Sequence, residues 1–287
     1  EVQMKILGIL ATLVTLLSLN IALISDLSAN EANQEVWTDL KTELFDKRKI
    51  NTKATWLKME APYRAHDAAL VPITIKAQLP KEGKPYLKAL TIVIDNNPVP
   101  VAAKMNLSPK LGPLHMETRI RVNQYTHVRA IVETNSGELY MISKYVKAAG
   151  GCSAPAMKDI DAKMASLGKM KLRQFSPKAE RGQKQSKAFN NTREIQLMVR
   201  HPNYSGMQMN QVTGYYIPAH FVSGMEIKLD DDPLIELEGA ISLSEDPMLR
   251  FRFLSDKSEP NLEFVVKDTK NKTFKKQWQL KSIERVG

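Results

Sequence analysis

The sequence has little cysteine, since Cys152 is the one thiol in 287 residues. A chain with one cysteine forms no intramolecular disulfide, so packing must stabilise its fold. Histidine is also scarce, and none lies within ten residues of Cys152 in the sequence. A cysteine nucleophile normally has a base beside it. A cysteine-dependent hydrolase is therefore only a minor alternative, and we predict a protein that is not an enzyme.

Motifs for bound cofactors are missing as well. The sequence contains no phosphate-binding loop, nucleotide fingerprint or haem-attachment motif, so no cofactor is predicted. No two histidines stand at ligand spacing, which leaves Met207-Gln-Met209 as a weak signal for copper. Asp230-Asp-Asp232 precedes Pro233 and is typical of a solvated turn. We predict no metal site.

Charge of one sign is concentrated in one segment. The net charge is +10, and between Lys158 and Arg193 ten Lys and Arg stand against three acidic residues. Phe175 and Phe189 are its aromatic residues, too few for a stacking platform on single-stranded nucleic acid. The segment is interpreted as a solvated linker or, alternatively, as a surface for an acidic partner protein.

The N-terminal region carries a long uncharged run. Lys5 is followed by residues 6–24 without charge, and the small residues Ser28 and Ala29 come shortly after it. This order is typical of a secretory signal peptide, here residues 1–32. The length leaves an uncleaved membrane anchor as the alternative. We expect the body of the protein to be exported to a bacterial periplasm.

Two regions show the alternation of β-strands. In the first, Met116, Thr118 and Ile120 alternate with charged residues. Further strands are expected there at 69–76, 90–95, 127–133 and 139–146, after a short helix at 35–45. In the second, strands are expected at 195–199, 225–229, 234–237, 249–253, 262–266 and 274–280.

The predicted fold is therefore all-β, with two immunoglobulin-like β-sandwich domains. The first domain comprises residues 33–152 and the second comprises residues 193–287. A helical and basic linker at 153–192 joins them, with a helix predicted at 155–167 and too few apolar residues at 176–187 for packing.

Cys152 lies where the first domain ends. Gly150, Gly151, Ser153 and Pro155 surround it, and they show no apolar periodicity. This pattern predicts an exposed loop thiol, with burial in the core as the alternative for a lone cysteine. Nearby cations favour the reactive thiolate. Candidates for that role are Lys144, Lys147 and Lys158.

The two domains resemble a known pair of proteins. Residues 56–152 resemble SoxY through Val71-Pro-Ile-Thr-Ile75, Asp95-Asn-Asn-Pro98, Thr118-Arg-Ile-Arg121, Val128-Arg-Ala130 and Tyr145-Val-Lys147 leading to Gly150-Gly-Cys152. Residues 193–283 resemble SoxZ through His201-Pro202, Ile217-Pro218, Gly239-Ala-Ile-Ser242, Asp246-Pro247 and Leu262-Glu-Phe264. The single chain is similar to the fused SoxYZ-like carriers that are associated with quinoprotein dehydrogenases.

The resemblance implies a carrier of thiosulfate or sulfur oxidation. In that family the cysteine holds the cargo covalently while separate enzymes load and release it, which assigns the carrier role to Cys152, with Gly150 and Gly151 as flexible support. In SoxY the chain ends shortly after this cysteine, whereas here it continues through Ser153. Implied partners are Sox-type enzymes or a quinoprotein dehydrogenase with its cytochrome c. A non-covalent accessory protein of a quinoprotein alcohol dehydrogenase is the alternative function.

Overall fold

The computed structural model describes residues 34–79, 85–154, 160–175 and 191–282. The signal segment predicted at 1–32 and the apolar-poor stretch at 176–187 lie outside these ranges. A helix spans residues 34–45, as the sequence predicts. Residues 1–47 form one unit and residues 48–287 a second one, and each is described by itself. Among the described residues, no helix combines the length and apolar character that crossing a membrane requires.

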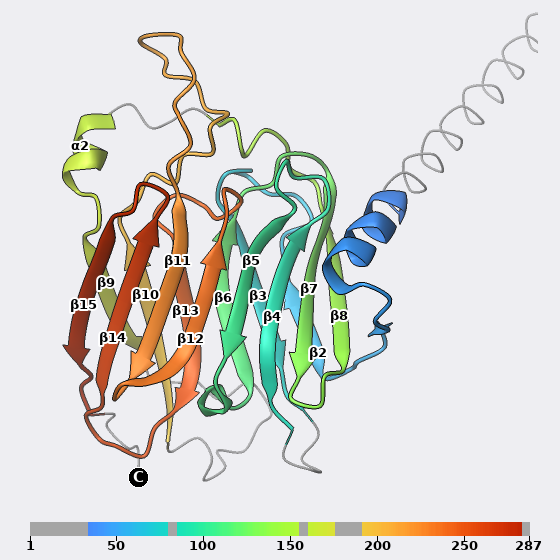
Figure 1. The fold of residues 1–287 in the computed structure, drawn as a ribbon, viewed down its shortest axis with the longest axis vertical. Coiled ribbons are helices and arrows are strands. Elements are labelled where there is room, and N and C mark those ends of the chain that lie inside the picture. Colours follow the sequence, from blue (N-terminus) through green and yellow to red (C-terminus); the bar gives the residue numbers. More distant parts are fainter. Residues whose placement is uncertain (1–33, 80–84, 155–159, 176–190, 283–287) are drawn as a thin grey trace, which may run out of the picture. The chain divides into compact units, whose positions relative to one another are not determined.

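The unit from residue 48 onward consists mainly of strands (Figure 1). Its first half contributes β1 (Ile50–Asn51), β2 (Leu57–Glu60), β3 (Val71–Ala77), β4 (Leu87–Ile94), β5 (Val101–Leu107), β6 (Leu114–Ile120), β7 (Thr126–Thr134) and β8 (Leu139–Val146), with a short 3-10 helix, η1 (Pro109–Leu111). Its second half contributes α2 (Ile160–Ala165), β9 (Met170–Phe175), β10 (Thr192–Val199), β11 (Val222–Leu229), β12 (Asp232–Gly239), β13 (Met248–Leu254), β14 (Asn261–Asp268) and β15 (Thr273–Gln279).

These strands form two sheets. The larger has nine strands in the order β1-β8-β7-β4-β5-β12-β11-β14-β15, and the smaller has six in the order β2-β3-β6-β13-β10-β9. Each half of the chain supplies strands to both sheets. The all-β prediction is confirmed at this level, because strands of two sheets are the main regular structure of the described residues and helices are few and short. The immunoglobulin-like topology stays a prediction.

The halves meet through strand pairing in both sheets. In the larger sheet β12 pairs antiparallel with β5 from Ile235 opposite Leu107 to Gly239 opposite Ala103. In the smaller sheet β13 pairs with β6 at Arg250 opposite Glu117 and at Phe251 opposite Met116. Backbone hydrogen bonds therefore run across the junction, and one apolar core contains residues of both halves.

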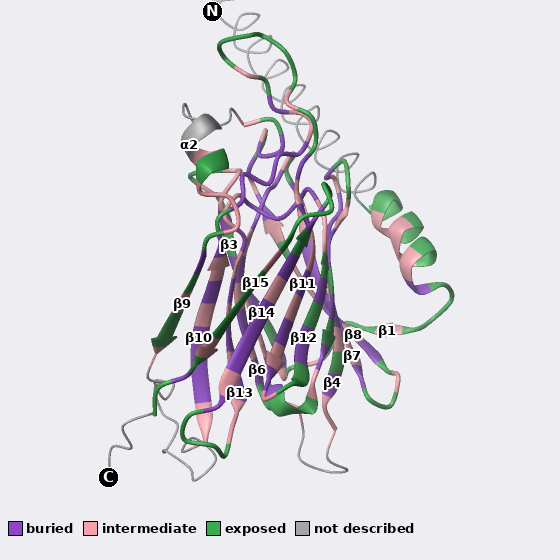
Figure 2. Cartoon of the chain, turned by 60° about the vertical axis from the view of Figure 1, so that its left-hand side comes forward, coloured by how far each residue is buried: buried purple, intermediate pink, exposed green. Residues whose placement is uncertain are grey.

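Burial along the strands follows the two-residue repeat of a sheet with one covered face. In β3, Val71, Ile73 and Ile75 are buried while Pro72 is exposed, and β13 shows the same alternation around Phe251 and Phe253. Figure 2 shows these buried stripes running along the strands. The apolar side chains of the two sheets thus form the core between them.

Strand β9 lies within the segment predicted as a linker. It pairs antiparallel with β10 over six residue pairs, from Glu194 opposite Phe175 to Val199 opposite Met170. Lys171 and Arg173 of β9 are exposed at this edge of the smaller sheet. Charged side chains on an edge strand hinder further strand addition. Part of the basic segment therefore belongs to the sheet.

Candidate functional site

The cysteine loop follows β8 at one end of the sheets. Lys147 still pairs with the chain beside it, since its N–H donates to the Tyr63 carbonyl at 2.7 Å. The chain then turns inward: the Gly150 N–H donates to the Asn123 carbonyl at 2.9 Å, and the Gly151 N–H donates to the Val122 carbonyl at 3.0 Å. These bonds attach the loop to the chain that follows β6.

Both glycines are required by this docked geometry. Gly150 has a φ of +79°, a conformation that disfavours residues with a Cβ. A Cβ on Gly151 would lie 2.1 Å from the Ala68 carbonyl oxygen and 2.7 Å from that of Val122. From the sequence, Gly150 and Gly151 were expected to make the loop flexible. In the docked loop they instead permit close backbone contact, which fixes the position of Cys152.

The Cys152 side chain has no exposed surface, which corrects the prediction of an exposed thiol. Burial raises the pKa of this thiol to about 11, although the Arg121 charge acts in the opposite direction. At pH 7 about one molecule in ten thousand then carries the thiolate, the form that reacts. No histidine among the described residues forms a hydrogen bond with the thiol. The docked loop is thus an unreactive state.

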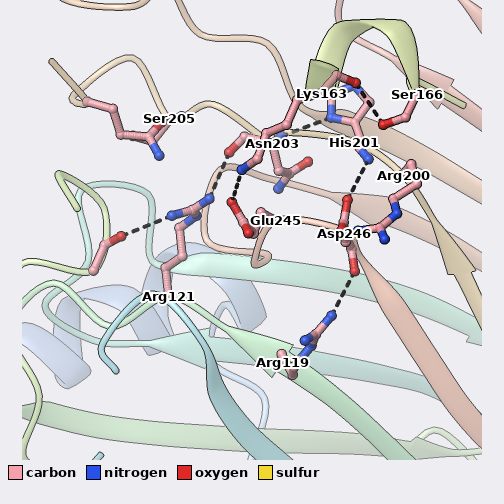
Figure 3. Close-up of polar contacts among 12 residues, drawn as sticks. Arg119, Arg121, Lys163, Ser166, Arg200, His201, Asn203, Ser205, Glu245 and Asp246 are labelled. Carbon is pink, nitrogen blue, oxygen red and sulfur yellow. Dashed lines mark hydrogen bonds and ion pairs between the residues drawn. The ribbon is translucent and has the colours of Figure 1, made fainter. Parts of the chain in front are cut away.

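Arg121 is the cation whose charge opposes the rise in the pKa of Cys152, and it is itself only 1% exposed. Its guanidinium donates to three backbone carbonyls: those of Gly151 at 3.1 Å, Asn203 at 3.3 Å and Leu243 at 3.3 Å. Burial lowers the pKa of Arg121. One buried side chain of the first half thereby joins the cysteine loop to two loops of the second half (Figure 3).

The three lysines predicted as cations have other positions. Lys147 lies with its Nζ 5.1 Å from the centre of the Tyr63 ring, and Lys144 is exposed on β8. Lys158 lies outside the described residues. Among the described residues, Arg121 rather than Lys144 or Lys147 is therefore the cation that acts on the thiol.

The second half covers the cysteine loop with residues 201–208. The Ser205 hydroxyl donates to the Cys152 carbonyl, and the Met207 N–H donates to the same hydroxyl oxygen at 3.2 Å. Gln208 is buried, and its Oε1 accepts from the Ser205 N–H at 3.0 Å. The backbone of the buried cysteine is hence bonded to a segment that follows it by about fifty residues in the sequence.

Asn203 holds this covering segment in place. It is fully buried and has a φ of +49°. Its side-chain amide donates to the Leu243 carbonyl at 2.7 Å, and its Oδ1 accepts from the Val222 N–H at 2.8 Å. Because Arg121 also donates to its carbonyl, Asn203 connects the cysteine loop to the start of β11.

A second buried polar group lies at the base of the same segment. The His220 Nε2 is 2.8 Å from the Asp268 Oδ2, and the His201 Nε2 is 3.6 Å from that oxygen. Burial lowers the pKa of His201 to about 4, and the neighbouring His220 adds to this effect. Although burial opposes it, the hydrogen bond from His220 contributes to a lowered pKa of Asp268. A neutral His201 near an ionised Asp268 is thus favoured here.

In the described part of the chain, one group of side chains has donor atoms close enough to share a metal ion, and it consists of His201, His220 and Asp268. The His201 Nδ1, however, accepts from the Asn203 N–H at 3.0 Å. A neutral ring that accepts at Nδ1 carries its proton on Nε2, the atom that faces Asp268. That nitrogen has no lone pair to offer a metal. The geometry therefore favours a buried polar group in which His220 is hydrogen-bonded to Asp268, while the His201 Nε2 faces the same carboxylate from 3.6 Å, beyond hydrogen-bond distance.

Solved structures with partial similarity include two kinds of protein. The sulfur carrier protein SoxY from Chlorobium limicola f thiosulfatophilum is 22% identical, with 42% of this chain and 98% of that chain covered and a TM-score of 0.36. A superoxide reductase (neelaredoxin) from Ignicoccus hospitalis is 15% identical over 32% of this chain and 77% of that chain, with a TM-score of 0.28. No curated protein sequence matches the chain.

Family models give the decisive match. The model of sulfur oxidation protein SoxY matches residues 41–152, and that of sulphur oxidation protein SoxZ matches residues 181–279. The chain contains a SoxY domain and a SoxZ domain. The two together are the domains of a sulfur-oxidation carrier. The SoxY match ends at Cys152, and the SoxZ match contains the segment that covers this cysteine.

Sequence reasoning missed the residues that bury the thiol: Arg121, Asn203 and Ser205. Arg121 falls on the polar side of the alternation that includes Ile120, which suggested a solvent-facing side chain. Ile120, Arg121 and Val122 are all buried because the strand ends at Ile120 and the SoxZ domain covers the following residues. Arg121 and His201 both lie in motifs that resemble SoxY and SoxZ. Those motifs do not show that the two regions of the chain come together in the fold.

Proposed function

We propose that the protein is an exported sulfur carrier that holds its cargo covalently on the Cys152 sulfur. The observation that supports this best is the position of Cys152. It is the one cysteine of the chain, it ends the SoxY domain, and it lies against the SoxZ domain through Arg121 and Ser205. A periplasmic location is part of the proposal and follows from the signal-like sequence at residues 1–32.

Carrier function requires the cysteine loop to leave its docked position. A thiol with no exposed surface and a pKa of about 11 cannot meet a partner enzyme. Four hydrogen bonds hold residues 150–152, and they involve Asn123, Val122, Arg121 and Ser205. Each contributes about 1 kcal/mol, so opening costs about 4 kcal/mol in the free protein. A partner that binds the open loop offsets this cost by its preference for that state.

The chemistry at Cys152 is formation of a sulfur–sulfur bond. The open thiolate attacks the outer sulfur of a persulfide donor, the donor's inner sulfur leaves as a thiolate, and no net oxidation occurs. Joining to thiosulfate forms the same type of bond but releases two electrons, which a partner such as a cytochrome c must accept. In both cases the cargo is attached to a loop that is held at both ends.

Mass analysis of the native protein tests this proposal. Protein isolated from its own host is analysed intact, before and after treatment with a thiol reductant. We expect an adduct on the peptide that contains Cys152, its loss on reduction, and no adduct in Cys152→Ser. Unmodified thiol in every preparation, together with full function of Cys152→Ser in the host, would falsify covalent carriage.

The second candidate is a non-covalent accessory role in a periplasmic quinoprotein alcohol dehydrogenase system. The basic segment from Lys158 to Arg193 favours it, since such a surface suits an acidic partner. Binding of a purified dehydrogenase or its cytochrome is measured at low and at physiological salt. Binding that weakens with salt and persists in Cys152→Ser supports this role, and absence of binding at both salt concentrations contradicts it.

A further inference from the structure

A hairpin extends from the end of the sheets at which Cys152 lies. It occupies residues 208–217, between the segment that covers the cysteine and the start of β11, and Figure 1 shows it beyond the strand ends. The Ile217 N–H donates to the Gln208 carbonyl at 2.8 Å, and the Asn210 N–H donates to the Tyr215 carbonyl at 2.9 Å. The Asn210 Oδ1 accepts from the Val212 N–H at 2.9 Å. The hairpin therefore has a defined conformation of its own.

The hairpin exposes large apolar side chains. Val212 is 93% exposed, Tyr215 is 78% exposed and Tyr216 is 66% exposed, and Met209 is also exposed. Tyr63, whose carbonyl accepts from the Lys147 N–H just before the cysteine loop, is exposed as well. Contiguous exposed apolar groups are unfavourable in water and mark interaction sites. Tyrosine and methionine are moreover enriched at the centres of protein interfaces.

This region lacks charge. Residues 201–225 contain no Asp, Glu, Lys or Arg, although 25% of the residues in the whole chain are charged. A surface without cations has little attraction for anionic lipid headgroups, which bind clusters of Lys and Arg. The tyrosine hydroxyls and the side chains of Asn210, Gln211 and Thr213 also need hydrogen-bond partners when they are buried. An uncharged protein surface fits both properties, because it does not depend on cations in the hairpin and it can offer hydrogen-bond partners to these side chains.

The hairpin is mechanically connected to the cysteine. Ser205, whose hydroxyl donates to the Cys152 carbonyl, is three residues before Gln208, and its N–H donates to the Gln208 side chain. Gln208 is in turn paired with Ile217 at the base of the hairpin. A displacement of the hairpin base therefore acts on the hydrogen bond that holds Cys152.

We propose that the hairpin of residues 208–217 inserts into an uncharged apolar recess on the protein that exchanges cargo with Cys152, and that this insertion loosens the docked cysteine loop. The proposal rests on the proposed carrier function and specifies its partner surface. The partner presents apolar walls with neutral hydrogen-bond acceptors and donors, and it lies close enough to receive the released thiol. Recognition and release of the thiol are then one event.

The test compares two full-length variants in the native host. The hairpin variant carries Val212→Ser, Tyr215→Ser and Tyr216→Ser. The control carries Val36→Ser and Met164→Ser, which replace exposed apolar side chains on two helices. The fraction of Cys152 with cargo is measured by intact mass, and folding is checked by thermal unfolding. We expect loading to fall at least about tenfold in the hairpin variant, the effect of losing one interface hot spot. The control loads like the wild type, and the melting temperatures agree.

The outcomes separate the two proposals. Absence of cargo on the wild-type protein contradicts the carrier function itself. Normal loading of a folded hairpin variant leaves the carrier function intact and overturns the docking role. If the hairpin variant melts early, single substitutions at Val212 and Tyr215 replace it, and the same comparison applies.

Two further measurements address other occupants of the hairpin. Sedimentation with vesicles of phosphatidylethanolamine and phosphatidylglycerol, if lost in the hairpin variant, would overturn the proposal in favour of a lipid surface. A dimer in equilibrium sedimentation that dissociates in this variant would overturn it in favour of a second copy. A photo-crosslinker at position 212 that captures a protein whose removal abolishes loading of Cys152 would support it.

Discussion

The cysteine loop, residues 147–152, and the hairpin of residues 208–217 lie at the same end of the sheets and present opposite surfaces. The loop contains the reactive group and hides it completely, whereas the hairpin contains no reactive group and exposes its apolar side chains. The loop is held by contacts with both domains, while the hairpin is held mainly by its own hydrogen bonds. Chemistry and recognition are thus assigned to separate segments, which the Ser205 contact connects.

Replacement of Gly151 should have the largest effect on the difference between the buried cysteine loop and the exposed hairpin. In Gly151→Ala the new Cβ would lie 2.1 Å from the Ala68 carbonyl oxygen, so the loop must leave its position. We expect a loss of about 4 kcal/mol in the free energy of unfolding and alkylation of Cys152 at least about tenfold faster. Denaturant unfolding and iodoacetamide kinetics measure these effects.

Gly137→Ala is the control for a Cβ that meets no neighbour: Gly137 has a positive φ, +86°, but nothing lies within 4 Å of its added Cβ. It should lose about 1 kcal/mol from backbone strain alone and leave the thiol as unreactive as in the wild type. A folded Gly151→Ala protein with a slowly reacting thiol would contradict the docked geometry.

Arg121→Met should have the next largest effect. The substitution removes the donor from the carbonyls of Gly151, Asn203 and Leu243, which stay buried. We expect about 3 kcal/mol of lost stability. Where the loop stays docked, the pKa of Cys152 should rise further, because Arg121 is the group that lowers it. Ultraviolet titration of the thiolate follows that pKa.

Arg119→Met provides the comparison, because Arg119 lies at the end of β6, two residues before Arg121. Arg119 donates to one carbonyl, that of Asp246 at 3.0 Å, so its loss should cost about 1 kcal/mol. Equal destabilisation by the two substitutions would contradict the special role of Arg121 at the junction.

Mild acid should destabilise the base of the hairpin. The pKa of His201 is about 4 in the folded protein against 6.5 without burial, so the unfolded chain binds more protons between these values. Stability therefore falls as the pH decreases from about 6.5 to about 4, and we expect a loss of about 2 kcal/mol between pH 7 and pH 5. The depressed pKa of Asp268 adds a further loss at lower pH.

Urea unfolding at a series of pH values measures this dependence. His201→Gln should flatten the curve between pH 7 and pH 5, while His66→Gln, at an exposed loop position, serves as the control. The same slope in wild type and His201→Gln would show that another group is responsible.

The substitution with the smallest expected effect tests the connection between the cysteine loop and the hairpin. Ser205→Ala removes the hydroxyl that donates to the Cys152 carbonyl and should cost about 1 kcal/mol. Because this bond holds the loop, alkylation of Cys152 should become about fivefold faster, as 1 kcal/mol corresponds to that ratio. Ser223→Ala, which removes a bond to the Lys267 carbonyl, should leave alkylation unchanged. Equal rates in all three proteins would exclude Ser205 as the link.

Local sequence patterns predicted most strands but not their partners. The strand expected at residues 139–146 has the bounds of β8, because an apolar-rich run of strand length follows the Asn135-Ser-Gly137 turn. The edge strand β9 was missed, since its basic residues are typical of a linker. The pairing of β5 with β12 joins positions more than a hundred residues apart, which no short-range pattern can show.

The sequence drew attention to Cys152 but did not predict its environment. Cys152 is the chain's one thiol, and its exposure was inferred from glycines and the absence of apolar periodicity. The buried loop is bonded to Ser205 of another domain, a contact that local composition cannot reveal. The weighed alternative of a buried cysteine agrees with the structure, although the cover is a polar network around Arg121 and Asn203.

The strand pairs that join β5 to β12 and β6 to β13 connect two domains of one chain, so dilution of the protein does not separate these domains. Because both domains belong to one polypeptide, their stoichiometry is fixed, and the entropy lost when two free molecules associate does not arise. The effective concentration of the SoxZ domain around Cys152 is set by covalent connection and is independent of expression level. After each opening, the cysteine loop can return to the same cover, even when the protein is scarce.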